Sequence, residues 1–140
     1  MLHDQHCHTK YSLDSKASLE EYYKICTKYN CKYFITTEHI DFNCVCNNQD
    51  WIVDYQKLKK ELNDLHKKYT SCIPLLGVEL GYRNEYISKM QDVIDSNSFD
   101  VVNLSVHDNG DCCYSTFSRW NHNAFCKTNL VCGIVPSYAS

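Results

Sequence analysis

The chain has 140 residues, of which 44% are hydrophobic, and it carries a formal net charge of -3 with a pI near 6.1. This length suits one globular domain with its own core, and the slightly acidic balance gives no electrostatic reason to expect nucleic acid as a partner. No run suits a transmembrane helix and no signal-peptide pattern opens the chain, so we expect a cytoplasmic protein without a membrane partner. Most of the ten cysteines are then expected to be free thiols.

The first third of the chain alternates between strand-like and helix-like patterns. Residues 1–8 are predicted to form a short strand that ends in His6-Cys7-His8. The capping box Ser18-Leu19-Glu20-Glu21, followed by apolar residues at helical spacing, predicts an amphipathic helix over residues 18–30. The compact run 32–37 contains strand-favouring side chains and predicts a second strand.

The middle of the chain continues the same alternation. Residues 40–50 are predicted to be a polar loop, and residues 51–70 to be a long helix with Lys and Glu on its solvent face. A third strand, a further helix and a fourth strand are predicted over residues 73–80, 84–95 and 101–106. The order βαβαβαβ implies parallel strands joined by right-handed crossovers.

Side chains that commonly bind metals stand at or just past the end of each predicted strand. Strand ends in a parallel sheet point to one face, so ligands at successive ends can meet around one metal cluster. Each residue alone also fits an exposed polar position, and only the joint placement indicates a site. Imidazoles suit Zn, Fe or Mn, and carboxylates shift the preference toward harder ions. The candidate ligands are His6, His8, Asp14, His39, Glu79 and His107.

Five segments together resemble the PHP (polymerase and histidinol phosphatase) family, and within it the histidinol-phosphatase branch. The resemblance covers about residues 2–111 and implies an α/β fold, an incomplete distorted (β/α)7 barrel with about four parallel βα units present. It also implies a two- or three-metal site at the C-terminal ends of the strands. The matching segments are Asp4 to Asp14, Leu19 to Tyr22, Thr37 to Asp41, Gly77 to Tyr82 and Phe99 to His107.

The resemblance further implies metal-dependent hydrolysis of a small-molecule phosphate monoester, with L-histidinol phosphate and histidine biosynthesis as the leading expectation. Two or three divalent ions (Zn, Mn or Fe) would be held by the six candidate ligands, with Glu79 as the bridging carboxylate. A metal-bound hydroxide would be the nucleophile, and no catalytic residue beyond the ligands is expected. Asp4 and Asp41 would support the ligands, or else be solvated loop carboxylates.

Past His107 the pattern ends. Residues 111–140 contain Cys112, Cys113, Cys126 and Cys132 and show no clear period. The resemblance implies later strands that supply a further His and an Asp-x-His pair, and nothing here matches them. We therefore interpret residues 1–110 as the N-terminal part of a PHP domain and residues 111–140 as the tail of a truncated or frameshifted product. The fourth strand would then be an exposed edge, through which the chain could self-associate.

Three alternatives remain open. The substrate could be another phosphate ester, such as a sugar phosphate, a nucleotide or phosphotyrosine. The chain could also be an inactive metal-binding fragment. A structural zinc protein is the third alternative, but Cys44-x-Cys46 and Cys112-Cys113 lack the C-x2-C spacing of common zinc sites and fit free thiols better.

Overall fold

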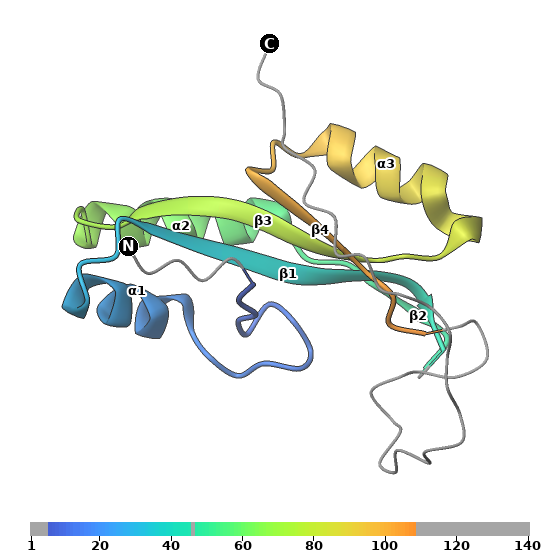
Figure 1. Ribbon diagram of the computed structural model, residues 1–140, viewed down its shortest axis with the longest axis horizontal. Helices are drawn as coiled ribbons and strands as arrows, with labels where there is room; N and C mark the ends of the chain where they lie inside the picture. The colour runs from blue at the N-terminus through green and yellow to red at the C-terminus, as the bar shows by residue number, and fades with distance from the viewer. Residues whose placement is uncertain (1–5, 46, 109–140) are drawn as a thin grey trace.

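The computed structural model describes residues 6–45 and 47–108. Three of its four strands are parallel, and the sheet order is β2-β1-β3-β4. Figure 1 shows this twisted sheet with α1 and α2 toward one end and α3 toward the other. The expected α/β class is confirmed. The elements are α1 (Leu19–Lys28), β1 (Tyr33–Cys44), β2 (Gln49–Trp51), α2 (Tyr55–Lys68), β3 (Ile73–Gly81), the short 3-10 turn Asn84–Tyr86, α3 (Ile87–Ser96) and β4 (Val101–Ser105).

Local side-chain caps set where the first two helices begin. The Ser18 hydroxyl accepts from the Glu21 amide at 3.3 Å, and the Glu21 carboxylate accepts from the Ser18 amide at 2.7 Å, which confirms the capping box. At α2, the Asp54 carboxylate accepts from the Lys57 amide at 3.0 Å. Both predicted helices are confirmed, each slightly shorter than expected.

One hydrophobic core joins the helices to one face of the sheet. It includes Tyr23 of α1, Leu58 and Leu62 of α2, and Val78 and Leu80 of β3, all at most 4% exposed. Burying a large apolar side chain contributes about 1.5–3 kcal/mol. Because side chains alternate along a strand, the apolar even-numbered residues of β3 leave its odd-numbered residues for the opposite face.

The expected first strand is wrong for the residues that the structure describes. Residues 6–8 lie beside β1 but are in no strand. The Thr37 amide donates to the Cys7 carbonyl at 2.8 Å, whereas the Cys7 amide donates to the Thr37 hydroxyl at 3.0 Å. The Thr37 hydroxyl thus accepts the hydrogen bond that a backbone carbonyl would accept from the Cys7 amide in a regular strand pair.

The expected polar loop over residues 40–50 is also wrong. β1 continues through this segment to Cys44, and β2 then pairs with it antiparallel. Ile40 and Phe42 are 1% and 4% exposed, so apolar side chains at alternate positions keep the segment extended. Asn48 in the turn and Asn43 at the irregularity of β1 between Asp41 and Cys44 both have positive φ, a conformation that Asn adopts more readily than most residues.

β4 is the edge of the sheet among the described residues, as expected, and Leu104 is 40% exposed there. Self-association through this edge stays a prediction. Asp4, Cys46 and the tail 111–140 lie outside the described residues. None of the described helices is long and apolar enough to span a bilayer. The described cysteines that carry free thiols are Cys7, Cys26, Cys31, Cys44 and Cys72.

Candidate metal centre

The register of the parallel strands brings polar side chains together on the face away from the core. His39 of β1 lies directly opposite Glu79 of β3, so both side chains point to the same side of the sheet. Asp41 follows His39 at the next position on that face. In β4, Ser105 lies opposite Gly81, two residues after Glu79. Each parallel strand therefore contributes a polar side chain near its C-terminal end.

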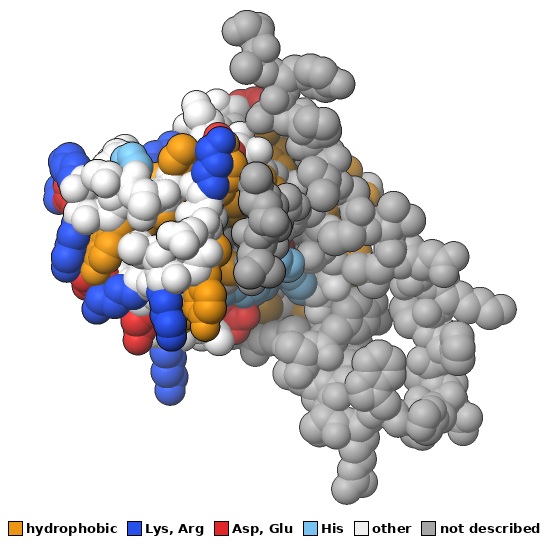
Figure 2. Space-filling model, turned by 60° about the vertical axis from the view of Figure 1, so that its left-hand side comes forward, with side chains coloured by type: hydrophobic (Ala, Val, Ile, Leu, Met, Phe, Trp, Pro, Cys, Tyr) orange, Lys and Arg blue, Asp and Glu red, His pale blue; other side chains and the backbone are white. Residues whose placement is uncertain are grey.

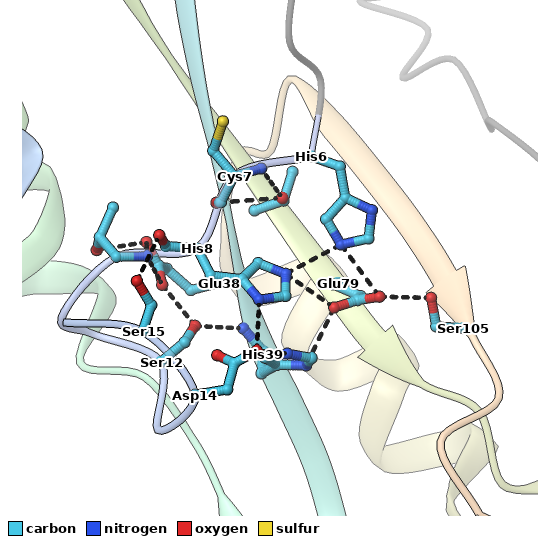
Figure 3. A network of polar contacts seen from close by, with 12 residues as sticks. His6, Cys7, His8, Ser12, Asp14, Ser15, Glu38, His39, Glu79 and Ser105 are labelled. Atoms are coloured by element: carbon cyan, nitrogen blue, oxygen red, sulfur yellow. Dashed lines mark hydrogen bonds and ion pairs between the residues drawn. The ribbon is translucent and has the colours of Figure 1, made fainter. Parts of the chain in front are cut away.

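The N-terminal segment closes over this face and brings three more of the predicted ligands (Figure 3). Nε2 of His6 and Nε2 of His8 lie 3.2 and 3.0 Å from the two carboxylate oxygens of Glu79, and they lie 2.9 Å from each other. Oδ2 of Asp14 lies 3.0 Å from Nδ1 of His8 and 3.2 Å from Nε2 of His39. Residues far apart in the sequence thus meet around one carboxylate.

His107, just past β4, completes the cluster. Its Nδ1 lies 2.6 Å from Oδ1 of Asp41, and its Nε2 lies 3.4 Å from Oε1 of Glu79. A carboxylate on one ring nitrogen fixes the tautomer and orientation of a histidine whose other nitrogen binds a metal. The six predicted ligands therefore lie together, and Asp41 stands where a supporting residue would. Figure 2 shows pale-blue histidine side chains gathered beside a red carboxylate residue.

The close approach of Asp41 and His107 over β3 depends on a glycine. A Cβ atom at Gly81 would lie 1.9 Å from Oδ1 of Asp41 and 2.9 Å from Nδ1 of His107. The position leaves room for the carboxylate–imidazole pair only because it has no side chain. A glycine inside a strand pattern is a signal for such close approach, and the sequence analysis did not use it.

Mutual hydrogen bonding shifts the pKa of two histidines in the cluster upward. Hydrogen bonding to Glu79 is the main cause that raises the pKa of His8 to about 9. Burial lowers the pKa of His107, but hydrogen bonds to Asp41 and Glu79 more than offset it and raise that pKa to about 10.

The carboxylate pKa values move the opposite way. Burial acts to raise the pKa of Glu79, but hydrogen bonds from His107, His8 and Ser105 outweigh it and hold that pKa far below its usual range. Burial also acts to raise the pKa of Asp14, but hydrogen bonding to His8 and the charge of His39 more than offset it, so this pKa is lowered as well. Both carboxylates are therefore ionised at neutral pH.

Several buried atoms of the cluster have no hydrogen-bond partner among the described residues. They are Nδ1 of His39, Oδ2 of Asp41 and Oε2 of Glu79. Their close polar contacts within the described part of the chain are with other members of the cluster: Nδ1 of His39 lies 3.0 Å from that Glu79 oxygen and 3.6 Å from that Asp41 oxygen. Nε2 of His8 lies 3.0 Å from the same Glu79 oxygen. Burying polar atoms without hydrogen bonds costs free energy. Ligand atoms that each lie about 2.0–2.2 Å from a tetrahedral zinc ion are separated from one another by roughly the distances found here. The donor set therefore fits a divalent cation.

The ligand atoms fall into three overlapping groups, each with all its atoms within 4.8 Å of one another. His8 and His39 each take part in two groups, so neighbouring ions could lie close together. Asp41 belongs to the third group, so its position also fits that of a ligand, in addition to the supporting role that the sequence indicated. The groups are His6, His8 and Glu79; His8, Asp14 and His39; and His39, Asp41 and His107.

Three further residues that contact the ligands or their strand carry no signal of this role in the sequence. Ser105 donates to Oε1 of Glu79 at 2.5 Å. Ser12 accepts from the His39 amide at 3.0 Å, and it also donates to the buried carboxylate of Glu38 at 2.5 Å. Glu38 stood within the Thr-Thr-Glu-His run, but nothing in the sequence showed what would surround it.

Comparison with known proteins gives one family and a consistent set of relatives. The PHP domain matches residues 4–131. A probable histidinol-phosphatase of Clostridium acetobutylicum is 38% identical over 107 residues, which are 76% of this chain and 40% of the relative. A histidinol-phosphatase of Lactococcus lactis is 28% identical over 109 residues, 77% of this chain and 40% of the relative. The chain thus spans about 40% of the length of these relatives.

A solved structure is similar to this chain as well. It is the crystal structure of histidinol phosphate phosphatase from Lactococcus lactis, complexed with zinc, L-histidinol and phosphate. The TM-score is 0.70 and the identity 28%, over 77% of this chain and 41% of that one. The similarity supports a partial barrel of the same architecture for the described residues.

Proposed function

We propose that this chain, which belongs to the PHP domain family, carries the N-terminal metal-binding part of a phosphate monoester hydrolase for L-histidinol phosphate. One observation carries the proposal: four imidazoles and three carboxylates converge at the strand ends, and three of their buried atoms lack hydrogen-bond partners among the described residues. The relatives named histidinol-phosphatase, and the neighbour with bound zinc, L-histidinol and phosphate, support this substrate.

We assign the metal-ligand role to six residues and a supporting role to one. Glu79 is the proposed bridging carboxylate, because its two oxygens contact different histidines. Asp41 is the proposed supporting residue, since it holds Nδ1 of His107 and leaves Nε2 of that ring directed at the site. The proposed ligands are His6, His8, Asp14, His39, Glu79 and His107.

The chain's own residues would set the geometry and charge of the reaction site. Two or three divalent ions (Zn, Mn or Fe), when bound, would supply Lewis acidity toward the phosphoryl oxygens and lower the pKa of water from 15.7 to about 7. Ser105 orients Glu79 through its hydroxyl, and Asp41 orients His107. We further propose that the chain acts in histidine biosynthesis in the cytoplasm, in keeping with its free thiols.

The test combines metal content and turnover on one purified sample. Hydrolysis of L-histidinol phosphate and of a generic aryl phosphate is measured after loading with zinc or manganese. Bound metal and histidinol phosphate turnover, both lost in His8→Ala and Glu79→Ala but kept in the matched surface control Glu85→Ala, would support the proposal. Glu85 is an exposed residue outside the cluster.

Two other outcomes would revise the proposal in different ways. Turnover of the aryl phosphate alone would keep the hydrolase class and replace the substrate. Bound metal without turnover of either ester would favour an inactive metal-binding chain.

A further inference from the structure

A second buried carboxylate lies next to the candidate metal centre but does not face it. Glu38 is fully buried and directly precedes His39 in β1. Because side chains alternate along a strand, the Glu38 carboxylate points to the opposite side of β1 from the His39 ring. Figure 3 shows it beside the N-terminal segment, next to Ser12.

The Glu38 carboxylate is surrounded by hydroxyl and amide donors. The Thr9 amide donates to its two oxygens at 3.0 and 3.2 Å. The hydroxyls of Thr9 and Ser12 donate at 2.6 and 2.5 Å, and the Thr36 hydroxyl donates as well. A buried carboxyl group is costly unless hydrogen bonds satisfy it, and here several donors converge on its two oxygens.

These donors connect the N-terminal segment, which carries three proposed ligands, to the strand that carries a fourth. Thr9 directly follows His8, and Ser12 stands two residues before Asp14. The Ser12 hydroxyl accepts from the His39 amide at 3.0 Å while it donates to Glu38. A single chain of hydrogen bonds therefore runs from Glu38 through Ser12 to the backbone of His39.

We propose that Glu38 is a positioning residue: it fixes residues 9–12 to β1 in the metal-free chain and thereby sets His8 and Asp14 against His39. The inference rests on the proposed function for its metal, but the ordering of the segment does not depend on metal. Holding the ligands in place beforehand removes part of the entropy cost of assembling the site when a cation arrives.

The test compares Glu38→Gln with a matched control on the same segment. Glu61 of α2 also contacts this segment, since it accepts from Lys10 Nζ at 2.9 Å and from the Tyr11 hydroxyl at 2.8 Å. These bonds do not involve Thr9 or Ser12. Zinc affinity is measured by competition with a chromophoric chelator. Glu38→Gln is expected to weaken binding about 10- to 100-fold, the range for partners of metal ligands, and Glu61→Gln to leave it unchanged.

Hydrogen exchange of the metal-free proteins gives a readout that is independent of zinc. The amides of Thr9 and His39 are expected to exchange faster in Glu38→Gln than in the wild type, and at wild-type rates in Glu61→Gln. If Glu38→Gln does not fold, Ser12→Ala replaces it, because that change breaks the link to the His39 amide and leaves Thr9 bonded to Glu38.

The outcomes separate this inference from the function it rests on. Folded variants with wild-type exchange rates and wild-type zinc affinity would overturn the positioning role. A wild-type chain that binds no zinc would overturn the metal site itself, and faster exchange in Glu38→Gln would then leave Glu38 as a residue that orders the segment without serving a metal. Equal loss of affinity in Glu61→Gln would also overturn the positioning role, because any anchor of the segment would then suffice.

Discussion

Two carboxylates, Glu38 and Glu79, lie buried on neighbouring strands, and their surroundings differ completely. Glu38 on β1 is 0% exposed and receives hydrogen bonds from hydroxyls and an amide. Glu79 on β3 is 4% exposed and is surrounded mainly by imidazoles: its Oε2 lies 3.0 Å from Nε2 of His8 and 3.0 Å from Nδ1 of His39. The two groups have the same chemistry and similar burial, so the difference comes from their partners.

Glu38 has the surroundings of a carboxylate that stabilises the fold, whereas Glu79 has the surroundings of a cation ligand. Fixed N–H and O–H donors satisfy the oxygens of Glu38 within the protein itself. Around Glu79 the contacts come mainly from histidine nitrogens, for which protons and a metal ion compete, so a cation would take the place of the protons that these rings now share with the carboxylate. Four predictions test this contrast, beginning with the largest effect.

Glu79→Gln should produce the largest loss. The amide keeps the size of the side chain but removes the negative charge and places N–H groups against the neighbouring imidazoles. Loss of a ligand should weaken zinc binding by more than the roughly 100-fold upper range for supporting residues. Isothermal titration with zinc measures it; binding within about tenfold of the wild type, the lower end of that range, would show that Glu79 is no ligand.

Gly81→Ala should chiefly weaken zinc binding, whereas Gly77→Ala should chiefly lower the stability of the fold. The first change pushes a methyl group into the space of Asp41 and should lower zinc affinity and hydrolysis while the chain stays folded. The second would place a Cβ 2.8 Å from the backbone oxygen of Thr36, so overpacking should lower the free energy of unfolding by about 1–3 kcal/mol.

Thermal melting and zinc titration of both glycine variants provide the check. We expect a lower melting temperature chiefly for Gly77→Ala and weaker zinc binding chiefly for Gly81→Ala. The reverse pattern would contradict the close approach of Asp41 and His107 over Gly81.

Zinc affinity should rise with pH. In the metal-free chain the pKa of His8 is about 9 and that of His107 about 10, both above the usual value for imidazole, so both rings hold protons at neutral pH. A metal needs neutral imidazoles and releases these protons. The affinity should therefore fall as pH drops below about 10, where His107 takes up its proton, and more steeply below about 9, where His8 does, by about tenfold per pH unit for each proton displaced.

Proton release is measured by calorimetry in two buffers with different ionisation enthalpies. The hydroxyl and amide donors around Glu38 do not titrate in this range, so the pH dependence should persist in a folded Glu38→Gln variant, which serves as the control. Binding that does not change between about pH 6 and 9 would contradict protonated His8 and His107.

Ser105→Ala should have the smallest effect. It removes one hydrogen bond to Glu79, worth about 1 kcal/mol, while the imidazole contacts of that carboxylate remain. Zinc affinity is expected to fall by about fivefold, the ratio that corresponds to such an energy. A loss as large as that of Glu79→Gln, measured in the same titration, would show that the hydroxyl has a role beyond orientation.

The sequence was sufficient to predict the helices, three of the four expected parallel strands and a set of candidate ligands that the structure brings together. The capping box at Ser18 and the apolar periods are local patterns, which is why α1 and α2 could be placed. His39, Glu79 and His107 could be predicted because parallel strands in sequence order bring their ends to one edge, whereas the segment that carries His6, His8 and Asp14 is in no strand. Glu79 was found in this way, even though its partners come from other segments.

Tertiary structure alone decided the features that depend on distant contacts. Thr9 and Glu38 are separated by 29 residues, and Asp41 and His107 by 66, so no local pattern indicates either pair. The same holds for the hairpin of β2 and for residues 6–8, where a Thr37 hydroxyl replaces a strand bond. The sequence determined which side chains reach the strand ends; packing across the sheet determined which carboxylate is satisfied by the protein and which is left for a cation.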